Sequence, residues 1–513
     1  MASPTPRRAL ALGVLAVWVV VVGMHIKREY FRTDDEVLMA GARSLGPVAY
    51  FYAVRMDGRT IGLAGSRLDT VDGGYTFEDW ITLDVPAMDT VHRAVTRTNA
   101  ELDTSLRLRG FSFDLRSEVG DFAVEGRVEG DSELALELGT DGDRQRTTLP
   151  VDDGTMLAAT LPLRLAASGR LRVGESYRTR VFDPSVVARR DVELRVVEAD
   201  TFMVPDSAVL DTSSGEWTAA TWDTVAVWRI EQAFGDMSVD SWIDADGRVV
   251  RAESPVGFSV ERTAYELIQQ DWERDRSDPA LASGYGAIIE STAIASDVSI
   301  EDVEASDRLA VRLGGVELDG FDLDGGRQTL RGDTLVVRRE SFSALSPDYR
   351  LPYRGDAVNA ATLEPTPLIQ ADDPRIVRAA ERIADGETDP AVLARRLTEW
   401  LYGELEKDIT LSVPSATQVL EAGRGDCNEH TVLYVALARA LGLPARTAVG
   451  VVQVGDRFYY HAWPEVWLDE WVAVDPTLGQ VPADAGHLRF LVGGLARQVE
   501  LIRLIGRLSL EAA

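Results

Sequence analysis

Apolar and polar residues alternate along most of the first half of the chain. Tyr50 to Met56 and Thr60 to Leu68 show this period of two on either side of an Asp57-Gly58 turn, and the segments LRLRGFSFDLRS, DFAVEGRVEG and SELALELGT repeat it between glycine turns. Strands with one buried and one solvated face have this pattern. It predicts a large antiparallel β domain within residues 31–270.

The N-terminus carries an apolar run instead of an alternating one. Between Arg8 and Lys27 no residue bears a full charge. As a helix this run would extend about 27 Å, close to the ~30 Å hydrocarbon core of a membrane. No small-residue cleavage site follows it, so residues 1–30 are predicted to be an uncleaved transmembrane signal anchor. The flanking charges are too evenly balanced to set its orientation.

The pattern changes again after residue 270. The stretch DWERDRSDPALASGY marks a boundary, and residues 271–341 are predicted to be a small linker and β segment. Residues 342–374 contain five prolines and are predicted to form an extended strap. Apolar residues at helical spacing then predict helices inside a domain over residues 375–492, one of them with Thr388 as its N-cap, and a C-terminal helix over 493–513.

The amino-acid composition limits the classes of partner that this chain is expected to bind. The chain has 83 acidic and 53 basic residues, a net charge of −30, which argues against binding to nucleic acid. Its single cysteine cannot form an internal disulfide. We find no metal-binding cluster and no phosphate-binding loop in the sequence, so neither a metal nor a cofactor is predicted.

The one cysteine, Cys427, is followed in order by His461 and Asp475, which are candidates for nucleophile, base and orienting carboxylate. The segment GRGDC precedes a predicted helix over Thr431 to Leu441, so the thiol is expected in the first helical turn. Thiols react as thiolates, and the positive end of a helix dipole and a nearby imidazolium both favour the anion.

The contact between His461 and Asp475 depends on strand register. Phe458 to Trp467 and Trp471 to Asp475 are predicted to be neighbouring strands. A hairpin loop centred on Leu468 or Asp469 places the two side chains on one face, whereas a two-residue turn would place them on opposite faces. We therefore expect a loop of three or five residues.

These motifs together resemble the bacterial transglutaminase-like superfamily, which has a papain-related fold. The matching residues are Gly425-Asp426-Cys427, His461-Ala462-Trp463 and Trp471 to Pro476, and the resemblance covers roughly residues 375–492. It implies a papain-like core with a Cys427, His461, Asp475 triad. Single-span bacterial relatives also imply a membrane-bound protein with its main body outside the cytoplasm. The expected fold class is α+β, with an N-terminal transmembrane helix, a large antiparallel β domain and a C-terminal transglutaminase-like core.

The sequence does not decide which other residues complete the site. The backbone N–H of Cys427 is one candidate oxyanion donor, and the second is either the side chain of Gln418 or a tryptophan indole. His430 is expected on the helix surface or behind the reacting groups. Asp484 and His487 are expected to cap or shape a loop.

The resemblance implies a thiol enzyme that cleaves or transfers an amide or peptide acyl group through an acyl-thioester. A cysteine protease or amidase and a protein-glutamine acyltransferase both fit, and hydrolysis is favoured because the resemblance is to the broad bacterial group. The expected partners are a protein or peptide substrate and the membrane. The alternative is a catalytically idle adaptor whose β domain binds a protein partner.

Overall fold

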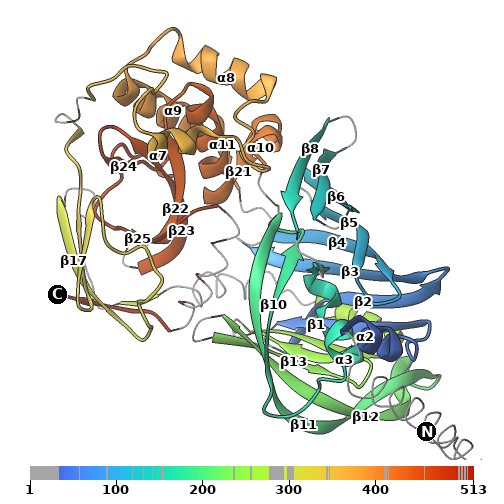
Figure 1. Ribbon diagram of the computed structural model, residues 1–513. Helices are drawn as coiled ribbons and strands as arrows, with labels where there is room; N and C mark the ends of the chain where they lie inside the picture. The colour runs from blue at the N-terminus through green and yellow to red at the C-terminus, as the bar shows by residue number, and fades with distance from the viewer. Residues whose placement is uncertain are drawn as a thin grey trace, which may run out of the picture.

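The computed structural model describes residues 34–513, apart from the stretches 277–293 and 297–305 and a set of short breaks. The breaks are at residues 57, 88–89, 118–119, 131, 141–142, 152–154, 235–236, 255–256, 343–344, 346, 409–412, 414, 456, 495–496, 498–500, 502–503 and 505–506. Figure 1 shows a β-rich N-terminal body beside a body of helices and smaller sheets.

A fifteen-stranded sheet forms the N-terminal body. Its order is β8-β7-β6-β5-β4-β3-β2-β1-β15-β14-β13-β12-β11-β10-β9, so the first and last strands pair in the middle of the sheet. The strands are β1 (Val48–Met56), β2 (Arg59–Val71), β3 (Gly74–Ala87), β4 (Thr90–Asp103), β5 (Leu108–Ser117), β6 (Gly120–Glu129), β7 (Glu133–Thr140), β8 (Asp143–Pro150), β9 (Met156–Leu157), β10 (Ser176–Asp183), β11 (Ala188–Asp211), β12 (Glu216–Phe234), β13 (Met237–Ile243), β14 (Val249–Glu253) and β15 (Phe258–Thr263).

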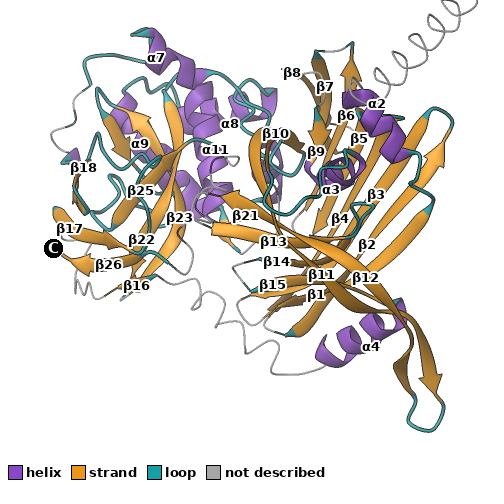
Figure 2. Ribbon diagram, turned by 60° about the horizontal axis from the view of Figure 1, so that its bottom comes forward, coloured by secondary structure: helices purple, strands orange, loops and turns teal. Residues whose placement is uncertain are grey.

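The alternation read from the sequence gives this sheet its core. In the middle of β5 and β6, buried residues alternate with more exposed ones, as at Phe111, Phe113, Phe122 and Val124. These side chains pack with two short helices, α2 (Asp34–Ala42) and α3 (Leu161–Ala167), the second of which follows the 3-10 turn η1 (Ala158–Thr160). A third helix, α4 (Tyr265–Arg276), follows β15 (Figure 2).

A second sheet joins distant parts of the chain. It has the order β16-β26-β17-β19-β18, with β16 (Ala295–Ser296), β17 (Arg308–Gly314), β18 (Gln328–Arg331), β19 (Thr334–Arg338) and β26 (Ser509–Ala512). The predicted C-terminal helix is therefore wrong at its end, because Ser509–Ala512 is a strand that pairs with β17 on one side and β16 on the other. Leu510 of this strand is buried.

The main described helices and a four-stranded sheet form the core of the second, C-terminal body. The helices are α8 (Pro374–Ala384), α9 (Pro390–Glu404), α10 (Ala416–Ala422) and α11 (Cys427–Ala440), and the sheet runs β24-β23-β22-β25, with β22 (Ala445–Val454), β23 (Arg457–Trp467), β24 (Trp471–Ala473) and β25 (His487–Val492). Two-residue strands β20 (Glu406–Lys407) and β21 (Arg424–Gly425) pair in parallel beside them. The N-cap of α9 is Asp389, one residue after the predicted Thr388.

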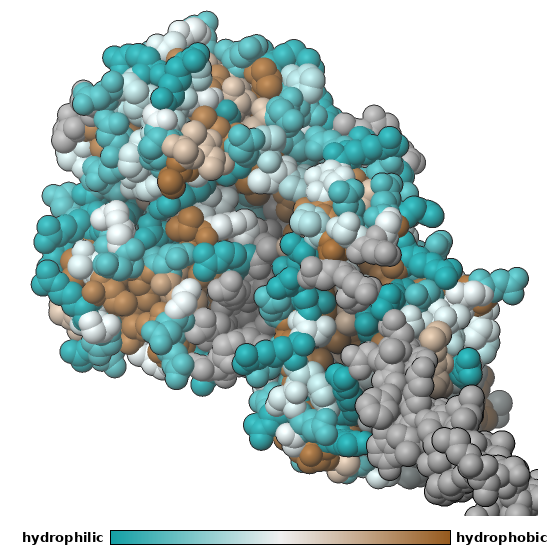
Figure 3. Space-filling model, in the orientation of Figure 1, coloured by the Kyte–Doolittle hydropathy of each residue, from teal (hydrophilic) through white to brown (hydrophobic). Residues whose placement is uncertain are grey.

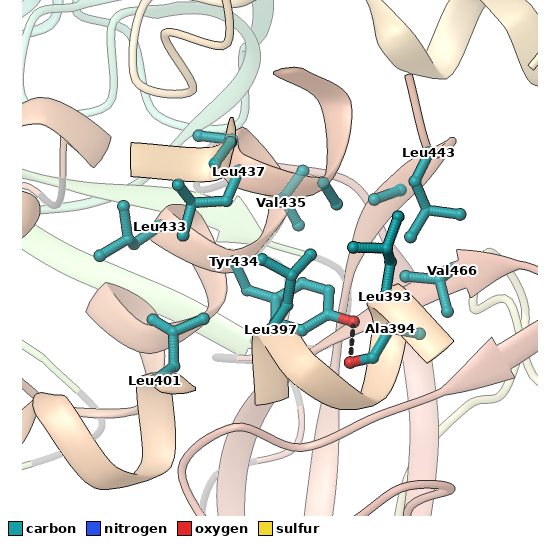
Figure 4. Close-up of a cluster of buried hydrophobic side chains, with 14 of the residues drawn as sticks. Leu393, Ala394, Leu397, Leu401, Leu433, Tyr434, Val435, Leu437, Leu443 and Val466 are labelled. Atoms are coloured by element: carbon teal, nitrogen blue, oxygen red, sulfur yellow. Dashed lines mark hydrogen bonds between the residues drawn. The ribbon is translucent and has the colours of Figure 1, made fainter. Parts of the chain in front are cut away.

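Helix α11 is the central element of this body. Its residues from Leu433 to Ala438 have no exposed surface. Leucines of α9 pack against it, and Tyr434 donates a hydrogen bond of 3.0 Å to the carbonyl of Ala394 (Figure 4). Because the helix is fixed along its length, its first residue is fixed as well.

The proline-rich strap packs along the C-terminal body. It contains the short helices α7 (Ala357–Ala360) and η3 (Ala361–Leu363). Leu351 is part of the helical core, and the N–H of Tyr353 bonds the carbonyl of Gly442 at 2.9 Å. The strap therefore belongs to the same packed unit as the helices.

Among the residues described here, no helix combines the length and the apolar character needed to cross a membrane. The predicted fold class, α+β with an N-terminal transmembrane helix, is corrected on this finding, since the described chain consists mainly of strands. The predicted single-pass membrane location is corrected with it, whereas the membrane as a partner stays a prediction. The segment on which they rested, residues 1–30, lies outside the described part of the chain.

The surface facing the viewer in Figure 3 is mostly hydrophilic.

Candidate active site

Cys427 is the first residue of α11 and is half-buried. A capping box holds the start of this helix: Asp426 accepts a hydrogen bond of 2.7 Å from the N–H of Asn428, and Glu429 accepts one of 3.1 Å from the N–H of Asp426. The residue before the cap must be small, because a Cβ on Gly425 would lie 2.2 Å from the Cβ of Glu429. The local sequence thus places the thiol at the positive end of the helix dipole.

The hairpin between β23 and β24 brings His461 to Asp475. Trp467 pairs with Trp471, which leaves a loop of three residues centred on Asp469. Asp469 has φ +65°, a left-handed conformation that aspartate tolerates better than most residues. The predicted loop length and register are confirmed, and the side chains of His461 and Asp475 meet.

His461 is held on two sides. Its Nε2 lies 2.7 Å from Oδ2 of Asp475, and its ring stacks on Trp463 with centroids 6.1 Å apart and an interplanar angle of 23°. Since Nε2 faces the carboxylate, Nδ1 is the nitrogen left for Cys427, whose negative charge acts on the imidazole. The other oxygen of Asp475 accepts the N–H groups of Thr477 and Leu478 at 2.7 and 3.0 Å.

Charge sets the protonation states of these groups. Burial alone would lower the pKa of His461, but the negative charges of Asp475 and Cys427 outweigh it and raise this pKa from 6.5 to about 9. Burial alone would raise the pKa of Asp475, yet the charge and hydrogen bond of His461, together with those of His487, hold it well below its usual range. At neutral pH the imidazole is therefore cationic and Asp475 is a carboxylate.

A second histidine, missed as a site residue from the sequence, joins the same carboxylate. His487 has no exposed surface, and its Nε2 lies 2.9 Å from Oδ2 of Asp475. Its Nδ1 lies 2.9 Å from Oδ1 of Asp484. The only signal in the sequence was the Asp-x-x-His spacing after the Asp-Pro motif, which is also common in plain loops.

His430 does not compete for the role of base. It is fully buried instead of lying on the helix surface, and its Nδ1 is bonded at 2.7 Å to the carbonyl of Asp426 in its own helix. Burial lowers its pKa, so it is neutral at pH 7.

Gln418 lies on α10 and is directed to the N-terminal body. Its side-chain N–H group donates to the carbonyl of Asp121 on β6. The structure thus does not bring it to Cys427 as an oxyanion donor. The indole alternative stays open, because the buried Nε1 of Trp463 has no hydrogen-bond acceptor among the residues that the structure describes.

His461, Asp475 and His487 are also a group that could offer three ligand atoms to a metal ion, all within 4.8 Å of one another. Hydrogen bonds of 2.7 and 2.9 Å from the two imidazoles to one carboxylate oxygen account for this geometry directly.

Comparison with known proteins supports the assignment of the domain. Residues 377–476 match the model of the transglutaminase-like superfamily, and this span contains Cys427, His461 and Asp475. It forms a transglutaminase-like domain, which points to a family of thiol enzymes. No curated protein matches the chain significantly.

Three solved structures show a limited likeness. A candidate cysteine protease from Cytophaga hutchinsonii is 15% identical, with 40% of this chain and 84% of that chain covered and a TM-score of 0.27. A β-barrel-like protein of a domain of unknown function from Brucella abortus is 18% identical, with coverage of 42% and 94% and a TM-score of 0.30. The periplasmic domain of TgpA from Pseudomonas aeruginosa, bound to ethylmercury, is 19% identical, with coverage of 34% and 74% and a TM-score of 0.25. All three TM-scores lie below 0.5.

Proposed function

We propose that this protein is a thiol enzyme that cleaves an amide or peptide bond through an acyl-thioester on Cys427, with His461 as base and acid and Asp475 as the group that orients the imidazole. The observation that carries the proposal is the position of His461. One ring nitrogen lies 2.7 Å from the buried carboxylate of Asp475, and the charge of Cys427 at the start of α11 acts on the same ring.

The steps follow from this geometry. The proton of Cys427 passes to His461, and the thiolate attacks the carbonyl carbon of the substrate, forming an S–C bond and an oxyanion. The N–H of Cys427 lies in the first helical turn, where backbone donors have no partner within the helix, and it is placed to stabilise the oxyanion. His461 then gives its proton to the leaving amine as the C–N bond breaks.

The second half of the cycle releases the acyl group. His461 takes a proton from water, the resulting hydroxide attacks the thioester, and the C–S bond breaks to restore the thiolate. Asp475 stabilises the imidazolium during both halves. An amine in place of water would give acyl transfer. Hydrolysis of a protein or peptide is the reaction we propose, because the resemblance is to the broad bacterial group.

The test uses the full chain with unfolded casein as a probe substrate. New amino termini would report peptide cleavage, released ammonia would report amide hydrolysis, and incorporation of a fluorescent amine would report transfer. We expect one of the two hydrolytic signals, with a thioester on Cys427 seen by mass spectrometry and no signal from Cys427→Ala. Activity that survives in Cys427→Ala would overturn the proposal, and silence in all three assays together with an unreactive thiol would favour the idle adaptor.

A further inference from the structure

His487 is enclosed between two carboxylates. Its Nε2 faces Asp475 and its Nδ1 faces Asp484, both at 2.9 Å, and the side chains of all three residues are at most 2% exposed. An ionised carboxylate only accepts hydrogen bonds, so both ring nitrogens must carry protons. His487 is therefore a buried imidazolium.

Neither carboxylate needs a proton of its own. Asp484 accepts a further hydrogen bond from the N–H of Gly486 and one from the side chain of Gln480, each at 2.9 Å. Burial alone would raise the pKa of Asp484, but its bond to His487 lowers it. Burial alone would lower the pKa of His487, but its bonds to Asp475 and Asp484 raise it. The hydrogen-bond geometry and the directions of the pKa shifts thus both indicate a protonated His487 between two ionised carboxylates.

Both histidines use the same oxygen of Asp475. His461 comes from β23 and His487 from β25, on opposite sides of β22, and their ring centroids lie 6.0 Å apart. On β22, His461 pairs with Gly450 and His487 pairs with Val452, so the β22 position beside His461 has no side chain. Oδ2 of Asp475 accepts at 2.7 Å from one ring and at 2.9 Å from the other.

We infer that His487, fixed by Asp484, is a second positioning residue of this active site, which divides the negative charge of Asp475 between two imidazolium ions. The inference rests on the proposed function of Cys427 and His461. Without His487, the whole charge of Asp475 would act on His461 and make its proton harder to release. A base that must return its proton to the leaving amine works best when its pKa is close to the working pH.

The small sheet braces this second histidine. Arg327 donates from Nη2 to the carbonyls of Ala483 and Asp484, both at 2.8 Å. Gln328 exchanges two hydrogen bonds with the main chain of Arg489, at 2.9 and 2.6 Å. None of these residues, nor His487, lies within residues 377–476, so the site extends beyond the segment that matches the family.

The ionisable groups that face this pair in the described structure come from four elements. They are Asp475 and Asp484 on the loop between β24 and β25, His461 on β23, Cys427 and His430 on α11, and Arg327, which precedes β18 and whose charge acts on Asp484. The contacts that join His487 to the catalytic pair in the described structure run through Asp475, which accepts from both histidines.

The test is the pH profile of Cys427 alkylation by iodoacetamide in the full chain, from pH 5 to 10. The single cysteine makes the label specific. The wild type should show two steps, formation of the ion pair and then loss of the proton of His461. In His487→Gln the upper step should move to higher pH by about one unit, because the positive charge near Asp475 is lost. Asp484→Asn should move it in the same direction, because His487 then keeps only one carboxylate partner and becomes a neutral imidazole.

Gln328→Met is the control, since it removes two hydrogen bonds from the strand of His487 without changing any charge near Asp475. It should leave the upper step where it is in the wild type. If His487→Gln does not fold, Asp484→Asn carries the test, since His487 stays in place there. An upper step at the same pH in wild type and Asp484→Asn would overturn the inference and leave the proposed function standing. A wild type with one step like that of a free thiol would overturn both.

Discussion

Trp467 pairs directly with Trp471 across a loop of three residues, and this pairing decides on which face of the sheet Asp475 lies. Removing one residue from the loop would shift the register and turn Asp475 away from His461. Deletion of Glu470 should therefore slow alkylation of Cys427 at pH 7 by on the order of tenfold. Asp469→Gly keeps the loop length and suits the φ of +65°, so it should retain the wild-type rate. A deletion variant with the wild-type rate would contradict this account of the register.

Asp475→Asn tests the role of the carboxylate. The raised pKa of His461, about 9, depends on the charge of Asp475. The amide should let this pKa fall, so the upper limb of the pH profile of hydrolysis moves to lower pH. Turnover at pH 7 should drop by on the order of a thousandfold, as expected when the orienting carboxylate of a triad is lost. An unchanged upper limb would show that another group holds the proton on His461.

Stability should depend on pH through the same pair. The pKa of His461 is higher in the folded state than its usual 6.5, so its stabilising effect is complete below about pH 6.5 and is lost as the pH rises through about 9. The pKa of Asp475 is lowered, so its effect is present above about pH 4 and is lost as the pH falls further. Urea unfolding should thus show the largest difference between wild type and His461→Gln between about pH 4 and 6.5. A difference that grows toward pH 9 would have the wrong sign for this pairing.

The core around α11 should respond to two substitutions by different amounts. Tyr434→Phe removes the 3.0 Å hydrogen bond to Ala394 and should lower the free energy of unfolding by about 1 kcal/mol. Leu397→Ala leaves a cavity at a fully buried position and should cost roughly 2–5 kcal/mol. Urea unfolding followed by circular dichroism measures both. Equal losses in the free energy of unfolding would contradict the expectation that packing at Leu397 contributes more than the hydrogen bond of Tyr434.

Gln418→Ala should leave the chemistry intact. The side chain is bonded to Asp121 on β6, so its loss affects the contact between the two bodies and not the oxyanion. Hydrolysis should stay within about twofold of wild type, whereas loss of a true oxyanion donor costs about a hundredfold or more. A drop of that size would return Gln418 to the active site.

The sequence predicts those parts of the structure that depend on local rules. The alternation in β5 and β6 predicts buried residues such as Phe111 and Phe122, and the loop length predicts the face of Asp475. The helix that carries Cys427 follows from its glycine and aspartate cap.

Other features depend on partners that are distant in the sequence. Ser509–Ala512 continues a helical pattern of leucines, yet it forms a strand because β16 and β17 offer two free edges, and tertiary pairing overrides local propensity. The role of His487 depends on the strand order β23-β22-β25, which brings its ring to Asp475. No spacing in the sequence contains that order.

The central claim is that His461 makes Cys427 anionic, and the most direct measurement is the rate of Cys427 alkylation by iodoacetamide at pH 7. We expect the wild type to react on the order of tenfold faster than N-acetylcysteine amide, because the imidazolium of His461 and the positive end of α11 both favour the thiolate. His461→Ala should react no faster than the free thiol. Equal rates for wild type, His461→Ala and the free thiol would contradict the claim.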